Sequence, residues 1–352
     1  MSEQPTGSLA KLPAMFAEME AAPAIVRPSQ FWEHYTALNL EQLERKGFDE
    51  FKRTINRNYF QFQLTDPRAP QYRALIAAWL RRPTPAVLRA KLDAPLDLEP
   101  EVVRRLGEGF ANKAYAVYLA LLWEYVKRRD RAGLLERLDE PLVGHPVHIT
   151  YRGHRVSEDL CNSTLELTAI LEGLSAGERP RTVIELGSGY GRLAWLVLTV
   201  LPDARYMLVD IPPALAVAEE YLTTLFSDRR TFGFRHFDAY DEVAGELDVA
   251  QLAFLTPNQL DLLPPQEADL FVNVSSLHEM RPEQIEHYFS AISTHCAGHF
   301  YSKQWTRSVN EPDGVIITHD DYPVPDRWDV IFDRTHPVQV EFFEALYRVD
   351  GR

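Results

Sequence analysis

Apolar and polar residues follow two different periods in the two parts of the chain. Between residues 29 and 139 apolar positions recur every three or four residues, as at Phe31, Tyr35, Leu38 and Leu43. This spacing places the apolar side chains on one face of a helix. Because prolines interrupt the region repeatedly, the pattern predicts short helices joined by turns.

The strongest helical pattern lies at residues 107–130. Its apolar side chains form a broad stripe that is rich in aromatic rings: Phe110, Tyr115, Tyr118, Leu119, Leu122 and Trp123. A stripe of this width is typical of packing between helices. We therefore predict a helical N-terminal domain over residues 1–140, and this part is the one that we expect to make contacts in a homodimer.

After Pro180 the pattern changes to short β-rich runs that alternate with helical stretches. The runs are RTVIELG, ARYMLVD, VAQLAFL, ADLFVNV and HFYSKQW, followed by the close pair WDVIFDRT and VEFFEALYRV. Strands that alternate with helices form a parallel sheet covered on both faces, and a close pair of strands forms an antiparallel hairpin. The pattern predicts an α/β fold with a doubly wound, mostly parallel, seven-stranded sheet over residues 141–352.

Composition and charge narrow the choice of partners. The chain has 352 residues, 45% of them hydrophobic, and a formal net charge of −14. A negative charge repels nucleic acid, so we expect a small-molecule partner. We expect a cytoplasmic protein without a membrane contact, because the sequence lacks a long apolar run and a secretory pattern at its start. Cys161 and Cys296 stand far apart, which favours neither a disulfide nor a thiolate metal site.

Three glycines follow the first β-rich run of the second half. Gly187, Gly189 and Gly191 come directly after TVIEL and before RLAWLVLTVL. A glycine turn between a strand and a helix lets a nucleotide approach the backbone, and the free N–H groups of the helix face it. The dinucleotide fingerprint has its third glycine one position later. We expect Gly187, Ser188, Gly189 and Gly191 to contact a nucleoside.

Two acidic residues stand at the ends of neighbouring predicted strands. Glu185 precedes the first glycine by two positions, and Asp210 ends the next strand, with Ile211 after it. A carboxylate beside a pyrophosphate in a partly dry site costs on the order of several kcal/mol, whereas it favours a cation. Asp210 can accept hydrogen bonds from both hydroxyls of a ribose. S-adenosylmethionine combines a nucleoside with a sulfonium and an ammonium and has no phosphate, so we expect this cofactor at Glu185, Asp210 and Ile211.

With these residues the sequence resembles the class I S-adenosylmethionine-dependent methyltransferases. Their motif ExGxGxG matches Glu185, Gly187, Gly189 and Gly191. The resemblance implies a Rossmann-like fold and an enzyme that transfers a methyl group from S-adenosylmethionine. Two other classes stay open at this point, a dinucleotide-dependent oxidoreductase and a noncatalytic module that keeps the cofactor site.

Two segments compete for the adenine end of the site. GFRHFDAYD would offer Asp238, and VAQLAFLTPNQ would offer Thr256, Asn258 and Gln259. The second segment leaves about 13 residues before the next strand, which suits a short crossover. We therefore predict that adenine lies near Thr256, Asn258 and Gln259, and we interpret residues 227–246 as an insertion.

The run ADLFVNVSSLHEM should end at the carboxyl edge of the sheet, where open α/β folds hold their reacting groups. We expect Asn273, Val274 and Ser275 to pass the methionine part of the cofactor. His278 and Glu279 follow, and either can serve as general base for a hydroxyl acceptor. We assign the base to His278, because a neutral imidazole suits neutral pH, with Glu279 orienting it. The reverse assignment stays open.

A longer pattern resembles the bacterial sugar O-methyltransferase family. The matching segments are FWEHY, NLEQLERKGFDEFKRTINRNYFQFQL, SEDLCNS, FLTPNQLDLLP and NVSSLHEM. The resemblance implies methyl transfer to a hydroxyl of a sugar or a glycosylated natural product, with the helical part covering the active site. Arg57, Asn58 and Tyr59 combine hydrogen-bonding groups with a flat ring, a mixture that suits hydroxylated rings, so we expect them to bind the acceptor. We expect no metal, and a nitrogen, carbon or carboxylate acceptor stays open.

Overall fold

The computed structural model describes residues 7–55, 66–175 and 177–349. Contacts divide the chain into two units. Unit 1 comprises residues 1–41, 173–336 and 341–352, and unit 2 comprises residues 42–172 and 337–340. This division differs from the predicted boundary between residues 140 and 141, because the first 41 residues belong to the unit that contains the large sheet.

Unit 1 contains one large sheet and a small hairpin. The strands of the sheet are β3 Thr182–Leu186, β4 Arg205–Val209, β5 Thr231–Phe232, β6 Leu252–Leu255, β7 Ala268–Val274, β8 Cys296–Trp305, β11 Asp329–Thr335 and β12 Phe342–Arg348. The hairpin is formed by β9 Arg307–Asn310 and β10 Val315–Thr318.

Short and long helices connect these strands. The α-helices are α1 Leu12–Ala21, α8 Arg192–Val200, α9 Ala214–Leu225, α10 Ala244–Leu247, α11 Pro257–Leu260 and α12 Pro282–His295. The 3-10 helices are η1 Gly7–Lys11, η2 Ala24–Val26, η6 Tyr240–Glu242, η7 Leu277–Glu279 and η8 His319–Asp321. Helix α2 Gln30–Lys46 begins in unit 1 and ends in unit 2.

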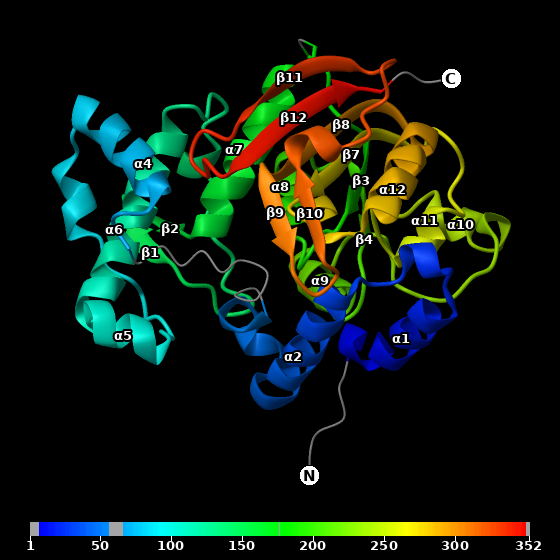
Figure 1. The fold of residues 1–352 in the computed structure, drawn as a ribbon, viewed down its shortest axis with the longest axis horizontal. Coiled ribbons are helices and arrows are strands. Elements are labelled where there is room, and N and C mark those ends of the chain that lie inside the picture. The colour runs from blue at the N-terminus through cyan, green and yellow to red at the C-terminus, as the bar shows by residue number, and fades with distance from the viewer. Residues whose placement is uncertain (1–6, 56–65, 176, 350–352) are drawn as a thin grey trace. The chain divides into compact units, whose positions relative to one another are not determined.

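The large sheet has the order β11-β12-β8-β7-β3-β4-β6-β5 (Figure 1). Every pair from β5 to β8 is parallel, whereas β12 is antiparallel to both of its neighbours. This arrangement confirms the mostly parallel sheet with a closing antiparallel hairpin. The predicted number of strands is wrong, because within the described ranges the sheet has eight. The additional strand β5 falls in the predicted insertion, and its two residues are too few to produce a periodic pattern.

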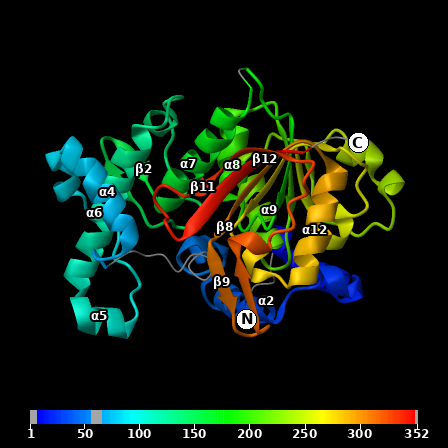
Figure 2. The same cartoon turned by 45° about the horizontal axis from the view of Figure 1, so that its top comes forward.

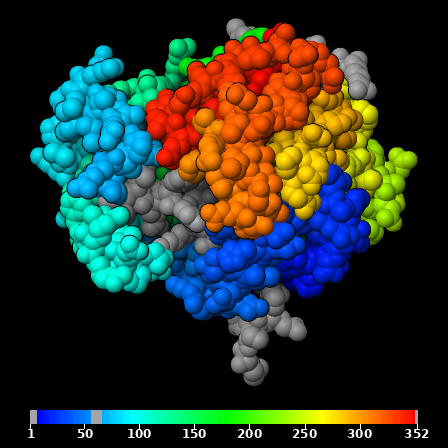
Figure 3. All heavy atoms as spheres, viewed as in Figure 1, coloured from blue at the N-terminus to red at the C-terminus, as the bar shows by residue number. Residues whose placement is uncertain are grey.

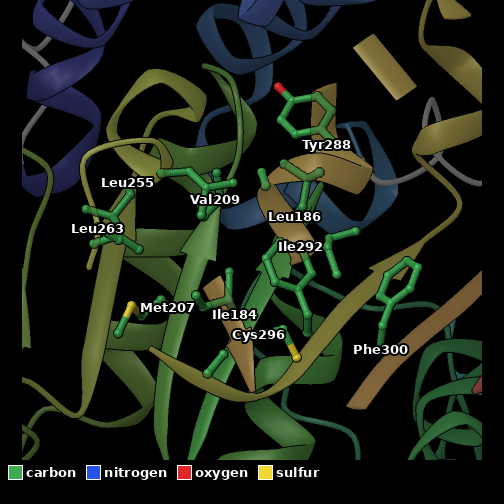
Figure 4. Close-up of a cluster of buried hydrophobic side chains, with 14 of the residues drawn as sticks. Ile184, Leu186, Met207, Val209, Leu255, Leu263, Tyr288, Ile292, Cys296 and Phe300 are labelled. Carbon is green, nitrogen blue, oxygen red and sulfur yellow. The ribbon is translucent and has the colours of Figure 1, made fainter. Parts of the chain in front are cut away.

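Helices cover both faces of this sheet, which explains why the central strands are apolar at successive positions. On one face Ile184, Leu186, Met207 and Val209 join Ile292 of α12 in a single buried cluster (Figure 4). Figure 2 shows α12 alongside the strands. Helix α8 packs on β4 and α9 packs on β6. The doubly wound prediction for the sheet agrees with this arrangement.

The carboxyl ends of the central strands meet at one edge of the sheet. Strands β3, β4, β6 and β7 are parallel, and they end at Leu186, Val209, Leu255 and Val274. The residues after each strand therefore gather at this edge, which is where open α/β folds bind ligands.

The start of the chain packs on unit 1 rather than forming part of a separate N-terminal domain. Met19 and Val26 are buried in the same cluster as the central strands. Asp313, between β9 and β10, accepts the Gln30 N–H at 3.1 Å and the Phe31 N–H at 3.2 Å, so it caps α2. In Figure 3 the atoms of the β9–β10 hairpin (orange) meet those of the start of the chain (blue).

Unit 2 is mainly helical. Its elements are η3 Phe48–Arg53, α4 Pro70–Arg81, η4 Pro85–Arg89, α5 Pro100–Leu106, α6 Glu108–Lys127, η5 Leu134–Glu136, the hairpin β1 Ile149–Tyr151 with β2 His154–Val156, and α7 Glu158–Gly173. The predicted helix at residues 107–130 is confirmed as α6, which packs against α4, α5, η4 and β1.

The aromatic stripe of α6 serves packing within unit 2. Tyr115, Tyr118 and Trp123 are buried, whereas Phe110 is 54% exposed. The Tyr115 and Tyr118 hydroxyls donate hydrogen bonds of 2.9 and 3.0 Å to the Glu158 carboxylate. Across the described ranges of both units, the helices are too short or too polar to cross a membrane.

Candidate functional site

The glycine turn joins β3 to α8 at the carboxyl edge. Gly187, Gly189 and Gly191 have φ angles of 69°, 57° and 84°, a left-handed conformation that costs other residues roughly 1–2 kcal/mol. A Cβ on Gly187 would lie 2.2 Å from Ser276 Oγ, and one on Gly191 would lie 2.8 Å from Leu222 Cδ1. A Cβ on Gly189 would meet no described atom within 4 Å. Packing therefore requires the outer glycines, and the middle glycine leaves one side of the turn open to a ligand.

Asp210 lies beside this turn at the end of β4. Its Oδ2 accepts the Gly189 N–H at 2.7 Å, and its Oδ1 accepts the Ile211 N–H at 2.7 Å. Each carboxylate oxygen can accept one more donor, as two ribose hydroxyls would require. The structure thus brings together the predicted residues Gly189, Asp210 and Ile211.

The ionisation of Asp210 depends on opposing influences. Burial raises the pKa of Asp210 to about 7, while the hydrogen bonds from the Gly189 and Ile211 backbones lower it. The negative charge of Glu279 raises the pKa further, and the hydroxyl of Ser188 lowers it. Because the charge of Glu279 acts on Asp210, these two acids belong to one electrostatic site.

Glu185 is buried within β3. Glu185 is only 3% exposed, and its Oε2 accepts a hydrogen bond from the Tyr206 hydroxyl at 2.8 Å. Tyr206 lies on the neighbouring strand β4. This hydrogen bond holds the carboxylate against the sheet, so Glu185 can favour a cation through its charge. A direct contact with the cofactor stays a prediction.

The loop after β6 presents unpaired polar atoms. Gln259 is fully buried, and its amide accepts the Thr256 N–H at 3.1 Å and donates to the Arg235 carbonyl at 2.8 Å. Its side chain therefore holds the loop in shape. Thr256 Oγ1 and Asn258 Oδ1 are buried and have no hydrogen-bond partner in the described part of the chain. Buried polar atoms normally have partners, so these two atoms fit the groups of a ligand.

The competing adenine segment, GFRHFDAYD, contacts the loop after β6 through the Arg235 carbonyl, but its acid is exposed. The side chain of Asp238 is 86% exposed, and it lies 3.5 Å from His236 Nε2. Strand β6, not the segment around Asp238, is the neighbour of β4 in the sheet. The prediction that the run VAQLAFL, rather than GFRHFDAYD, supplies the strand next to β4 is therefore confirmed.

Asn273 ties the end of β7 to its surroundings. Its Nδ2 donates to the Leu186 carbonyl at 2.8 Å and to Ser276 Oγ at 2.7 Å. Its Oδ1 accepts the Leu277 N–H at 3.2 Å and Gln304 Nε2 at 2.6 Å. These bonds use both donors and the acceptor oxygen of the amide, so Asn273 shapes the loop. The cofactor contact predicted for it remains a prediction.

The turn after β7 is conformationally strained. Val274 is 8% exposed, and Ser275 has a φ of 58°, a value that side chains rarely adopt. The Ser275 N–H donates to the Lys303 carbonyl at 2.8 Å, which holds the turn against β8. Strained residues cluster at functional sites, and this one immediately precedes the segment with His278.

His278 has one ring nitrogen held by Gln304, at 3.0 Å between Nδ1 and Oε1. The Gln304 amide is oriented by two backbone groups. Its Nε2 donates to the Asn273 carbonyl at 3.2 Å, and its Oε1 accepts the His278 N–H at 3.4 Å. Since Oε1 is an acceptor, Nδ1 must carry a proton, and Nε2 carries the lone pair of the neutral ring.

Glu279 lies next to this lone pair. Its Oε1 is 3.5 Å from His278 Nε2, and its Oε2 is buried without a hydrogen-bond partner in the described ranges. Its side chain is 16% exposed, against 2% for His278. The Glu279 main-chain carbonyl accepts Ser29 Oγ and Asn310 Nδ2, each at 3.1 Å. The predicted pair therefore lies at the site, with its backbone held from two directions.

The groups that a ligand could contact are mainly hydrogen-bond acceptors. They are the Asp210 carboxylate, Glu279 Oε2, Asn258 Oδ1 and the hydroxyl of Thr256. Two neighbouring acids oppose a pyrophosphate and favour a cation. These residues fit S-adenosylmethionine: Asp210 would hold the ribose hydroxyls, Asn258 and Thr256 the adenine, and Glu279 the positively charged end.

Two further points concern the acceptor and metal ions. Arg57, Asn58 and Tyr59, which we predicted to bind the acceptor, lie outside the described residues. In the ranges that are described, no three His, Cys, Asp or Glu side chains are arranged to hold a metal ion.

The sequence did not reveal the residues that hold the predicted site residues in position. Tyr206 binds Glu185, Ser276 fills the space beside Gly187, and Gln304 orients His278. Gln304 is a fully buried amide near the carboxyl end of β8, directly after the buried polar residues Ser302 and Lys303. Such a residue must find partners in the fold, and they lie next to the site.

Comparisons with known proteins find similar solved structures. No model of a protein family matches the chain, and no curated protein sequence matches it. An S-adenosylmethionine-dependent methyltransferase from Clostridium acetobutylicum is similar over 54% of this chain and 91% of that chain, with 13% identity and a TM-score of 0.38. The PH0226 protein from Pyrococcus horikoshii is similar over 55% of this chain and 92% of that chain, with 12% identity and a TM-score of 0.38.

A third solved structure covers more of this chain. The mitomycin 7-O-methyltransferase MmcR is similar over 80% of this chain and 69% of that chain, with 12% identity and a TM-score of 0.33. At such low TM-scores the residues of the site have to decide the function.

Proposed function

We propose that this protein is an S-adenosylmethionine-dependent methyltransferase. The observation that carries the proposal is the pair of interacting acids at the glycine turn. Asp210 binds the Gly189 N–H, and the charge of Glu279 adds to the effect of burial, which raises the pKa of Asp210. Such a pair favours a cationic nucleoside over a dinucleotide with its two phosphates. When bound, S-adenosylmethionine supplies a methyl group that the sulfonium makes electrophilic.

The acceptor in this proposal is a hydroxyl group. A hydroxyl is a poor nucleophile until its proton is removed, and a positioned base contributes roughly 10²–10⁴-fold to the rate. His278 suits this task because Gln304 occupies Nδ1 and leaves the lone pair on Nε2. The Glu279 carboxylate, 3.5 Å from Nε2, then stabilises the protonated ring.

We further propose a sugar or a glycosylated small molecule as the bearer of that hydroxyl. The support is the resemblance of the sequence to sugar O-methyltransferases, together with the net charge of −14, which disfavours nucleic acid. Orientation of the two reactants then supplies the remainder of the rate enhancement.

The cofactor assignment is tested by calorimetric titration. The wild-type protein should bind S-adenosylhomocysteine, and NAD should not compete. Asp210→Asn should weaken binding roughly tenfold or more, because a charged acceptor of the ribose hydroxyls is lost. Tight binding of NAD by a protein that ignores S-adenosylhomocysteine would overturn the proposal.

The acceptor assignment is tested by label transfer from radiolabelled S-adenosylmethionine to a panel of glycosylated metabolites. A labelled methyl ether on a sugar is the expected product. His278→Gln should lower kcat roughly 100-fold and leave the Kd for S-adenosylhomocysteine nearly unchanged. Label on a nitrogen atom would contradict the hydroxyl acceptor and leave the cofactor assignment intact.

A further inference from the structure

The N-terminal segment, residues 7–31, runs past the groups that form the site. Ser8 binds α9 through its N–H and Glu220 Oε2, at 2.6 Å. Farther along, Glu18 of α1 binds Asn258 of α11. At the end of the segment, Ser29 binds the Glu279 carbonyl. Asn258 and Glu279 both follow the carboxyl ends of parallel strands, so the segment borders the proposed cofactor site.

Glu18 of α1 is only 8% exposed, and its carboxylate contacts two other side chains. Its Oε1 accepts Asn258 Nδ2 at 2.5 Å, and its Oε2 lies 2.5 Å from His236 Nδ1. The hydrogen bond and the negative charge of Glu18 raise the pKa of His236 above its ordinary value. The Glu18 carboxylate is thereby held between the two partners, with one oxygen for each.

The contact with Glu18 decides which way the Asn258 amide faces. A carboxylate accepts hydrogen bonds and cannot donate them, so the amide must turn its Nδ2 toward Glu18. The other end, Oδ1, is buried and has no hydrogen-bond partner in the described ranges. Glu18 thus makes Asn258 an acceptor toward whatever occupies the site.

The position of Asn258 identifies the part of the ligand that it would meet. It follows β6, and β6 is the neighbour of β4, which ends at Asp210. A nucleoside whose ribose is held by Asp210 can extend its base toward the end of β6. The amino group at position 6 of adenine is a donor, whereas the 6-oxo group of hypoxanthine is an acceptor.

We infer that Glu18 is a positioning residue that makes the nucleoside site selective for 6-aminopurines by orienting Asn258. The inference rests on the proposed function, since it concerns the adenine end of the same cofactor. The 6-amino group of adenine would donate a hydrogen bond to Asn258 Oδ1. The 6-oxo group of hypoxanthine would instead place two acceptors face to face, and this mismatch would weaken the binding of hypoxanthine.

The test compares two probes, S-adenosylhomocysteine and S-inosylhomocysteine, by calorimetry on the full chain. Wild-type protein should prefer the adenosyl compound by about tenfold or more. Glu18→Gln keeps the shape of the side chain but can donate as well as accept, so Asn258 can turn over. The preference should then fall to about threefold or less, chiefly through tighter binding of the inosyl compound.

Two further variants complete the test. Asn258→Leu removes the acceptor and should also abolish the preference. Glu220→Ala removes the Ser8 contact of the same segment without touching Asn258, so its preference should equal that of the wild type. Circular dichroism checks that each variant is folded.

The outcomes separate this inference from the proposed function. If wild-type protein binds neither probe, the proposed function fails and the inference fails with it. If wild-type protein binds S-adenosylhomocysteine but Glu18→Gln keeps the full preference, the inference is overturned and the proposed function stands. An equal loss of preference in Glu220→Ala would also overturn it, because the effect would then belong to the segment as a whole.

Discussion

At the scale of single residues, Asp210 experiences two opposite effects. The Gly189 and Ile211 N–H groups stabilise its carboxylate, whereas burial and the charge of Glu279 destabilise it. Burial has the larger effect, since the pKa rises from 3.8 to about 7. Both forms of the acid are therefore present near neutral pH, and small changes nearby alter their ratio.

The affinity for S-adenosylmethionine should consequently rise with pH through about 7. A cation favours the ionised acid, so binding lowers the pKa of Asp210 and releases a proton, and affinity grows as the free protein loses that proton. Calorimetry should find Kd roughly tenfold lower at about pH 8 than at about pH 6.

Glu279→Gln provides the control for this pH dependence. Removing the neighbouring negative charge lowers the pKa of Asp210, so the rise in affinity should move to lower pH. Asp210→Asn should remove the rise. An unchanged pH dependence in both variants would show that another group is responsible.

His278 should be found with its proton on Nδ1 whenever its ring is neutral. The Gln304 amide can only accept at Oε1, as its contacts with the Asn273 and His278 backbones require. Nitrogen-15 NMR of the histidine rings distinguishes the two tautomers. In Gln304→Leu the preference should disappear and kcat should fall roughly tenfold or more.

Ser302→Ala is the matched control for Gln304→Leu. It removes a 3.3 Å contact of Gln304 Nε2 and leaves Oε1 untouched. The tautomer and the rate should therefore stay as in the wild type. A wild-type ring protonated on Nε2 would contradict the assignment of Nε2 as the basic atom.

At the scale of elements, the turn between β3 and α8 uses its glycines in different ways. Gly187 and Gly191 face neighbouring side chains, and Gly189 faces open space. The first two are requirements of folding, and the third leaves room for a ligand. Substitutions should therefore separate stability from binding within five residues.

Gly189→Ala should lower the affinity for S-adenosylhomocysteine roughly tenfold or more and cost only roughly 1–2 kcal/mol of unfolding free energy. Gly187→Ala should cost more, roughly 2–5 kcal/mol, because the new methyl group would meet Ser276. Denaturant unfolding and calorimetry measure the two quantities.

A double variant tests the cause of that loss. Gly187→Ala with Ser276→Gly removes the side chain that the methyl group would meet, and part of the stability should return. If Gly189→Ala bound the cofactor normally, the ligand would not approach the open side of the turn.

The alternation of strands and helices was enough to predict the elements that carry the site. The sequence around Gly187 and Asp210 predicted β3, α8 and β4 because their patterns are local and strongly apolar. Strand β5 was beyond prediction, since two residues have no period. Gln304 and Glu18 were missed for another reason: their partners are set by tertiary contacts, which a local pattern does not contain.

At the scale of the whole molecule, the two units are not consecutive parts of the chain. Residues 1–41 belong with residues 173–336, and residues 42–172 form the core of the other unit. Most of the aromatic stripe of α6 is buried. The predicted homodimer therefore remains a proposal that would need another surface.

Asp313 provides a test of how the start of the chain is held. It caps α2 through Gln30 and Phe31, so Asp313→Ala should lower the unfolding free energy by roughly 1 kcal/mol. Hydrogen exchange followed by mass spectrometry should find faster exchange at the start of α2. Asp320→Ala, which alters an exposed acid in η8, should change neither quantity; equal effects of both variants would refute the cap.

The pairing of the N-terminal segment with distant partners has a consequence for biosynthesis. Glu18 leaves the ribosome 240 residues ahead of Asn258, and Gln30 leaves it 283 residues ahead of Asp313. At roughly 5–20 residues per second, the nascent helix α1 waits roughly 10–50 seconds for the partner that it orients. Until then the apolar face of α1 lacks that part of its native packing surface. The chain can thus acquire the proposed adenine edge of its site only after residue 258 has been synthesised, and a polypeptide interrupted before that residue would never acquire it.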